Sequence, residues 1–340
     1  AATDPDFEMP TVLRGNLAYD YELPLGILAS GEITYTDVQK DIQYRDLNLV
    51  PTGATTVGGR PVYTRVSSGF TGLYFLTNTS DGKALTAGIE LKQRERHGFL
   101  WSAGYLYQDA EEVYPGTSSQ ASSQFLNTSV FDPQNPGAAP STYANEHRIT
   151  GTAAYRFGIG PVGSTVSMYV NRQSGRPYST TFGGGGLDVN GDGVRGNDLL
   201  YVPASPDEVI LTGATWDQFN AYIEADSSLR SRRGKVVERN SGSSPWTTQL
   251  DLRWAVNVPV TRVKVEVTAD ILNLLNFIDS DKGDFRYARF GEVSPVNFGG
   301  IDPVTGKLRY TVLFTDKNRR FDLDDVRSRW QAKLGLRISL

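Results

Sequence analysis

The chain has 340 residues, of which 34 are basic and 38 acidic, and it contains no cysteine. The near balance of charge excludes the broad basic surface of a nucleic-acid-binding protein, and the lack of cysteine excludes disulfides, thiolate metal sites and cysteine nucleophiles. The two histidines, His97 and His147, stand far apart without a metal-ligand spacing, so we expect neither a histidine-based triad nor a zinc site.

The start of the chain and its hydropathy do not indicate a membrane helix. Residues 1–7 have neither the basic n-region nor the apolar core of a signal peptide, so we expect that a leader was removed or that the chain begins inside a larger protein. Mean hydropathy is -0.35, and the longest apolar runs are shorter than the ~20 residues of a membrane helix. Hydropathy scans nevertheless miss transmembrane barrels, in which only every second residue faces lipid.

Alternation of apolar and polar residues recurs along the chain and predicts strands, because successive side chains of a strand point to opposite faces. In 247–258, for example, Leu250 and Trp254 lie on one face and Asp251 and Arg253 on the other. This strand and the next, 263–271, read as a hairpin whose arms have about a dozen residues each, against about 5–6 in soluble proteins and about 9–11 for a tilted membrane-spanning strand. The expected strands are 11–23, 27–36, 84–94, 99–107, 146–157, 166–170, 247–258, 263–271 and 326–340.

The connections alternate between short corners and long segments rich in Gly, Pro, Ser and Asn. The corners are 23–26, 95–98, 158–161 and 259–262, and the long segments, which we expect to be irregular, are 38–82, 111–145, 173–244 and 274–325. Outer-membrane barrels have short periplasmic turns and long external loops, so the connections of a chain that runs up and down alternate between the two kinds. Aromatic residues near strand ends fit the interfacial girdles of such barrels: Tyr19, Tyr21, Trp101, Phe157, Trp254 and Trp330.

These observations predict an all-β fold, an antiparallel up-and-down transmembrane β-barrel portion with about nine long strands. A closed barrel with an odd number of strands is unusual, and an open edge in lipid leaves backbone groups unpaired. Either a strand is missed in 63–78 or the chain is a piece of a larger barrel, and we favour the piece. A soluble secreted β-protein or β-rich enzyme is the remaining alternative, although we expect no enzymatic activity.

Several segments resemble the C-terminal barrel of TonB-dependent outer-membrane transporters, in particular the Oar-like branch, which often carries a carboxypeptidase-regulatory-like domain. The resemblance covers nearly the whole chain, and the order and spacing of the segments carry it. They are 4–10 (DPDFEMP), 76–82 (LTNTSDG), 174–178 (SGRPY), 188–193 (DVNGDG), 197–203 (NDLLYVP), 232–235 with 238–240 (RRGK and ERN) and 270–276 (DILNLLN).

The resemblance implies that residues 1–340 are the last nine strands of a 22-stranded barrel in the outer membrane of a Gram-negative cell. It implies energised uptake of a large or scarce solute, of the siderophore, oligosaccharide or peptide class, with a plug domain, the TonB complex, outer-membrane lipid and lipopolysaccharide as partners. Two features depart from the family. No plug domain or TonB-box segment is found in these residues, and the chain ends in Leu340 rather than in the usual aromatic residue.

One loop motif matches the first half of an EF-hand-like calcium loop, in which oxygens at positions 1, 3 and 5 converge on the ion and a glycine permits a sharp turn. The twelfth position holds Leu199 where a bidentate Glu is expected. The motif therefore indicates either a structural Ca²⁺ in an external loop or a turn rich in Gly, Asp and Asn without metal. The candidate ligands are the side chains of Asp188, Asn190, Asp192 and Asp198 and the backbone carbonyl of Val194.

Charged residues outside this loop form two further groups. The basic group Arg230, Arg232, Arg233 and Lys235 could meet an anionic substrate or lipopolysaccharide phosphates, but a solvated loop paired with Glu224 and Glu238 is the simpler reading. The other group lies on the polar strand faces, where we expect salt-bridge ladders along the barrel interior: Arg14, Arg148, Arg156, Asp251, Arg253, Lys264, Glu266 and Asp270. The alternative function to transport is an outer-membrane structural or surface-binding barrel with long calcium-stiffened loops.

Overall fold

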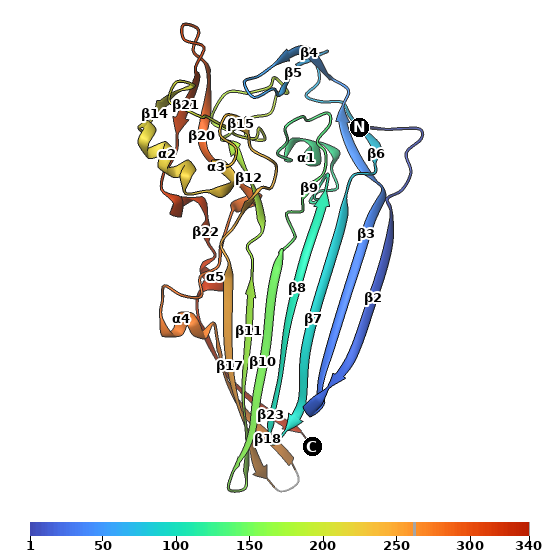
Figure 1. Cartoon of the computed structure of the whole chain (residues 1–340), viewed down its shortest axis with the longest axis vertical. Helices are drawn as coiled ribbons and strands as arrows, with labels where there is room; N and C mark the ends of the chain where they lie inside the picture. The colour runs from blue at the N-terminus through green and yellow to red at the C-terminus, as the bar shows by residue number, and fades with distance from the viewer. Residues whose placement is uncertain (261–262, 340) are drawn as a thin grey trace.

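The computed structural model describes residues 1–260 and 263–339. Nine long strands lie side by side in chain order, and each pairs antiparallel with the next, so the path runs up and down through one sheet (Figure 1). The strands are β2 (Thr11–Leu23), β3 (Ile27–Asp46), β7 (Lys83–Arg96), β8 (Phe99–Glu112), β10 (His147–Ile159), β11 (Val162–Gln173), β17 (Thr247–Val260), β18 (Val263–Leu272) and β23 (Gln331–Ser339). The all-β, antiparallel up-and-down fold class expected from the sequence is therefore confirmed.

The two ends of the sheet differ as the sequence predicts. At one end β2 and β3 are joined by the short helical turn η1 (Pro24–Gly26), and β7 and β8 by a turn in which His97 and Gly98 both have positive φ. At the other end the long connections rise above the strands (Figure 1). The corner expected at 259–262 begins later than predicted, since Pro259 and Val260 still pair in β17, and Thr261 and Arg262 lie outside the described residues.

The apolar face of the sheet is not covered by protein. Leu17 is 70 % exposed, Trp254 49 % and Leu334 86 %, and the clusters of buried apolar side chains in the described chain lie in and around the long connections, reaching the sheet only at the upper end of β3. Exposed apolar patches of this extent mark a surface that faces another apolar phase. The sheet is therefore the wall of a transmembrane barrel, with its apolar face toward lipid.

The opposite face is polar and internally paired. The guanidinium of Arg253 lies 3.8 Å from the carboxylate of Glu266 and 3.7 Å from that of Asp270, and Arg156 is paired with Glu95 beside the neighbouring turn. Arg148 donates to Asn171 across β10 and β11 at 3.0 Å. The expected salt bridges are therefore confirmed for Arg253 and Arg156, whereas Arg148 bonds to a neutral amide instead.

Aromatic side chains mark both ends of the lipid-facing surface. Near the short turns, Tyr19 stacks on Tyr21 and Tyr155 on Phe157. Near the long connections, His147 stacks on the indole of Trp246 with ring centroids 5.9 Å apart. Amphipathic rings at two levels are typical of proteins that cross a membrane, where each belt meets one interface.

The expectation that the long connections are irregular is wrong. They contain short elements held together by pairings between distant segments, such as the parallel pairing of Ser179 with Glu292 in a five-stranded sheet. Except for β20, which has ten residues, these strands have seven residues or fewer and are too short for alternation to reveal them. They are β1 (Ala2–Thr3), β4 (Leu49–Thr55), β5 (Pro61–Arg65), β6 (Tyr74–Thr79), β9 (Ala139–Pro140), β12 (Pro177–Phe182), β13 (Tyr201–Val202), β14 (Val209–Thr212), β15 (Lys235–Val236), β16 (Gly242–Ser243), β19 (Arg286–Tyr287), β20 (Glu292–Ile301), β21 (Leu308–Val312) and β22 (Asp322–Leu323).

Short helices complete this loop region. The longest begins with a capping box, in which Thr215 and Gln218 satisfy each other's backbone N–H groups, and its Phe219 and Ile223 are fully buried in the main apolar cluster. None of the helices in the described part of the chain has the length and hydropathy to cross a membrane. They are α1 (Ala121–Leu126), α2 (Trp216–Glu224), α3 (Ser227–Arg230), α4 (Leu274–Ile278) and α5 (Asp325–Ser328), with 3-10 turns η2 (Arg289–Gly291) and η3 (Lys317–Arg320).

Two expectations about strands need correction. Residues 63–78 do contain strands, but β6 pairs with the upper end of β3 and with β1, so it adds no tenth spanning strand. The last strand begins at Gln331 rather than at Val326, because the carboxylate of Asp324 accepts the N–H groups of Val326 and Arg327 and starts a helical turn. Leu340 lies outside the described residues.

Candidate functional site

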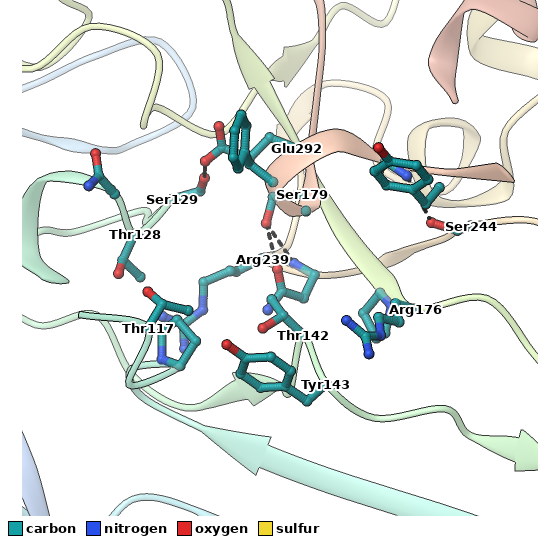
Figure 2. Close-up of a pocket in the computed structure, with 18 of the residues that line it drawn as sticks. Thr117, Thr128, Ser129, Thr142, Tyr143, Arg176, Ser179, Arg239, Ser244 and Glu292 are labelled. Carbon is teal, nitrogen blue, oxygen red and sulfur yellow. Dashed lines mark hydrogen bonds between the residues drawn. The ribbon is translucent and has the colours of Figure 1, made fainter. Parts of the chain in front are cut away.

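A large cavity lies among the long connections and reaches down to the upper ends of β11 and β17. Figure 2 shows residues that line it. Its volume is about 1260 Å³, which exceeds the roughly 300–1,000 Å³ of pockets for small ligands. Gln173 and Thr247, which belong to the polar faces of β11 and β17, lie at its floor. The cavity therefore opens where the polar side of the sheet ends.

The segment from Ser174 to Arg176 forms one wall and explains part of the SGRPY motif. The hydroxyl of Ser174 accepts the N–H of His147 at 3.0 Å and closes the top of β10 and β11. A Cβ on Gly175 would lie 2.0 Å from the carbonyl oxygen of Ser244, so only glycine permits this close approach of the two segments. The exposed side chain of Arg176 then lies at the cavity, with its guanidinium 5.8 Å from the ring centroid of Tyr143.

Arg239 and Asn240, from the ERN motif, join two connections behind the cavity. The guanidinium of Arg239 donates to the carbonyls of Val113, Glu112 and Gly137 at 2.7, 2.8 and 2.8 Å. The next residue, Asn240, donates to the carbonyl of Pro140 at 2.6 Å and exchanges hydrogen bonds with Ser179. This contact fixes the connection after β8 against the one after β11.

Glu292 contributes a carboxyl group on the side of the cavity opposite Arg239 (Figure 2). The hydroxyl of Ser129 donates to it. Burial disfavours the charged form and raises the pKa of Glu292 above its usual range, and the hydrogen bond from Ser129 offsets only part of this shift. The carboxyl group is thus held by Ser129 in a largely buried position.

The remaining lining combines positive charge with aromatic rings. Among the described residues that line the cavity, five are arginine and three are acidic, and none is lysine. The arginines are Arg176, Arg195, Arg239, Arg286 and Arg327, and the acids are Glu112, Glu292 and Asp324. The aromatic residues are Tyr143, Phe285, Tyr287 and Phe290, and the side chain of Phe290 is 93 % exposed at a positive φ of 55°.

The predicted calcium loop forms a compact turn. The carboxylate of Asp188 accepts the N–H groups of Asn190, Gly191 and Gly193 at 3.1, 2.7 and 2.6 Å. The carboxylate of Asp192 accepts the N–H of Val194 at 2.7 Å. Asp188, Asn190 and Asp192 are thus brought together as the motif predicts, and these hydrogen bonds are also those of a turn without metal.

Asp198, the fifth predicted ligand, has a different partner. Its carboxylate forms a buried ion pair with Arg60 at 3.0 Å. Burial raises the pKa of Asp198 above its usual range, Arg60 opposes this shift, and repulsion from Asp192 and Asp188 adds to it. In the part of the chain that the structure describes, no group of three or more His, Cys, Asp or Glu side chains is arranged to hold a metal. The calcium site stays a prediction.

The three arginines of the basic group before the seventh long strand have partners within the loop region, as the simpler interpretation predicts. Arg233 lies 2.7 Å from the carboxylate of Glu224, and Arg232 lies 2.8 Å from that of Glu238. Arg230 donates to the carbonyl of Glu224 at 2.9 Å. None of the three lines the cavity.

Sequence reasoning did not identify the cavity residues as a site. Arg176 and Arg239 each lie in a segment that carries the family resemblance, SGRPY and ERN, and this is the signal that could have drawn attention to them. Nothing in the sequence indicates that Glu292 and Ser129, which are 163 residues apart, share one cavity.

Comparison with solved structures finds similarity to an outer membrane transporter. The outer membrane transporter YddB from Escherichia coli is 12% identical, with a TM-score of 0.45, over 98% of this chain and 33% of that chain. The chain thus spans about a third of the length of that structure. No protein-family model matches the sequence, and no curated protein matches it.

Proposed function

We propose that this chain is the C-terminal part of a TonB-dependent receptor in the Gram-negative outer membrane and forms part of the barrel through which a large or scarce solute is taken up. The observation that carries the proposal is the two-sided sheet. Its apolar face is uncovered while its polar face holds paired charges such as Arg253 and Glu266. A soluble protein would bury the apolar face, whereas a barrel turns it toward lipid and the polar face toward its interior.

The direction of the edge strands supports a larger barrel. β2 pairs only with β3, and β23 only with β18, in the residues that the structure describes. Because the nine strands alternate in direction, β2 and β23 run the same way, so joining these two edges would require a parallel pair. Antiparallel closure needs an odd number of additional strands, and closure is required because open edges are not tolerated in lipid.

The folded connections and their cavity support solute capture. They enclose about 1260 Å³ at the end of the polar face, where a solute would enter the barrel from outside the cell. Siderophores, short oligosaccharides and short peptides are solutes of the size that such a volume admits. The plug domain and the TonB complex enter this proposal through the family resemblance of the sequence.

The first experiment tests membrane location and barrel structure. The full-length protein should sediment with the outer membrane, require detergent for extraction, and migrate faster on an SDS gel before boiling than after. Recovery in the soluble fraction without detergent would exclude both the transporter and any other barrel.

A second experiment separates transport from surface display. Cells that produce the protein should accumulate one member of a panel of labelled siderophores, oligosaccharides and peptides, and a protonophore should abolish the accumulation. A surface-binding barrel would bind a panel member without accumulating it, whether or not the protonophore is present, and would thereby contradict the transport proposal.

A further inference from the structure

Two arginines of the cavity lack a carboxylate partner. Arg176 and Arg195 both line the cavity, and no carboxylate oxygen among the described residues lies within 4.0 Å of either guanidinium. Both residues are exposed, and both belong to the long connection between β11 and β17. Exposed arginines without a partner are available for a ligand.

The other two arginines at the rim behave differently. Arg286 lies 2.9 Å from the carboxylate of Asp284, and Arg327 lies 3.4 Å from that of Asp324 while its guanidinium covers the ring of Phe285 at 4.7 Å. These charges are neutralised within their own loops. The loops around the cavity thus supply carboxylate partners to Arg286 and Arg327, but not to Arg176 and Arg195.

Arg239 adds a fixed positive charge to the wall. Its side chain is 9 % exposed, its direct partners are backbone carbonyls, and its Nε has no hydrogen-bond partner. Burial lowers the pKa of Arg239, but a guanidinium remains protonated in proteins. A buried cation without a contacting carboxylate projects its field into the cavity, because little water screens it.

The acidic residues of the cavity do not cancel this charge. Asp324 is paired with Arg327, and Glu292 is held by Ser129 with its pKa raised by burial. Glu112 accepts the N–H of Thr142 at 3.3 Å and lies near Arg239, so it offsets part of one arginine. With Arg286 and Arg327 neutralised by Asp284 and Asp324, three arginines remain against two carboxyl groups, which leaves the cavity cationic.

We propose that the cavity binds a solute that carries two or more carboxylate or phosphate groups, with Arg176 and Arg195 as its direct contacts and Arg239 as a fixed charge behind them. Guanidinium groups bind carboxylate and phosphate oxygens through paired, charge-assisted hydrogen bonds. The ring of Tyr143, which Arg176 covers, orients that side chain toward the cavity. This inference rests on the proposed function and names the chemistry of the solute that the same site captures.

The test measures binding to the full-length protein in detergent by isothermal titration calorimetry. The probes are tricarballylate for the carboxylate class, inorganic pyrophosphate for the phosphate class and maltotriose as a neutral control, all in buffer without divalent cations. We expect at least one anion to bind and maltotriose not to bind. The tighter of the two anions identifies which group the solute carries.

The variants Arg176→Gln and Arg195→Gln should each weaken the binding of that anion by about tenfold, and the double variant by more. The matched control is Arg230→Gln, at the exposed last residue of α3 and outside the cavity, which should leave affinity unchanged. Heat-modifiable migration verifies that each variant is folded. Failure of both anions to bind, equal binding of maltotriose, or unchanged affinity in the folded double variant would overturn the proposal.

This test is independent of uptake. If anions bind through Arg176 and Arg195 but no solute accumulates in cells, the anion site stands and the transport proposal fails. If solute accumulates under energised conditions but neither anion binds, transport stands and the anion site is wrong.

Discussion

Arg60 and Asp198 form a buried ion pair between the β4–β5 hairpin and the predicted calcium loop. Arg60 Nη1 donates to Asp198 Oδ1 at 3.0 Å, the two residues are 138 positions apart, and neither side chain is more than 2% exposed. Arg60 Nη2 also donates to the carbonyl of Leu199 at 2.6 Å. This contact joins the first long connection to the third, so it stabilises the assembly of the loops above the sheet.

We expect Arg60→Met to destabilise the loop region by about 3–5 kcal/mol, because it leaves the carboxylate of Asp198 buried without a counter-charge. Hydrogen exchange should show faster opening of 188–202 while the long strands remain protected. The double variant with Asp198→Asn should recover part of the loss, because it removes the unpaired charge. Equal protection in Arg60→Met and the wild type would contradict a structural role for the pair.

If the loop around Asp188 and Asp192 binds Ca²⁺, the ion should stabilise it. At a free Ca²⁺ concentration of a hundred times the dissociation constant, the stability of the loop should rise by about 2.7 kcal/mol. The protease resistance of 188–198 in calcium and in EGTA measures this gain. Asp192→Asn should abolish the difference, whereas Asp207→Asn, at an exposed position outside the motif, should preserve it. Identical resistance in calcium and EGTA would favour the turn without metal.

The two faces of β11 should respond differently to a charge. Met168 lies on the lipid-facing side and Tyr169 on the polar side, where it is opposite Asp251. Met168→Arg should destabilise the barrel by about 2–4 kcal/mol, since it places a charge against hydrocarbon. Tyr169→Arg should be tolerated, because the new guanidinium can meet Asp251. Urea unfolding in lipid vesicles measures both, and equal costs would contradict the assignment of the faces.

The carboxylate of Asp226 should make the loop region sensitive to acid. Burial raises its pKa, but hydrogen bonds from Ser228 and Tyr178 and the charge of Arg320 outweigh burial, so the pKa lies below 3.8. The folded state therefore keeps the group ionised at pH values where the unfolded chain binds a proton. The stabilisation is complete above about pH 4 and is lost as the pH falls through the lowered pKa.

Asp226→Asn should destabilise the loop region at pH 7 by about 3–5 kcal/mol, because it leaves Arg320 buried without its partner. The variant should also lose part of the acid dependence seen in the wild type. Proteolysis of the loops with pepsin between pH 2 and pH 5 measures that dependence. Asp207→Asn serves as the control, and an acid profile unchanged by Asp226→Asn would show that another group governs it.

The long strands could be predicted because their pattern is local. One face of a membrane-spanning strand contacts lipid along its whole length. Every second residue, as from Leu13 to Leu23 or from Leu250 to Val258, must therefore be compatible with lipid, and this period of two is visible in the sequence. The polarity of the opposite face, with Arg253 near Glu266 and Asp270, follows from the same alternation. The nine strands and the separation of short turns from long connections were therefore determined by the sequence.

The loop region and its cavity were decided only by the tertiary structure. Pairings such as Ser179 with Glu292, Arg60 with Asp198 and Arg239 with Val113 join segments more than a hundred residues apart, and no periodicity encodes them. Even at Asp198, which the motif marked as a ligand, the partner comes from another connection. The alternation arises because lipid is uniform and each residue contacts it independently of the others. The cavity instead depends on which distant residues satisfy one another's charges and hydrogen bonds.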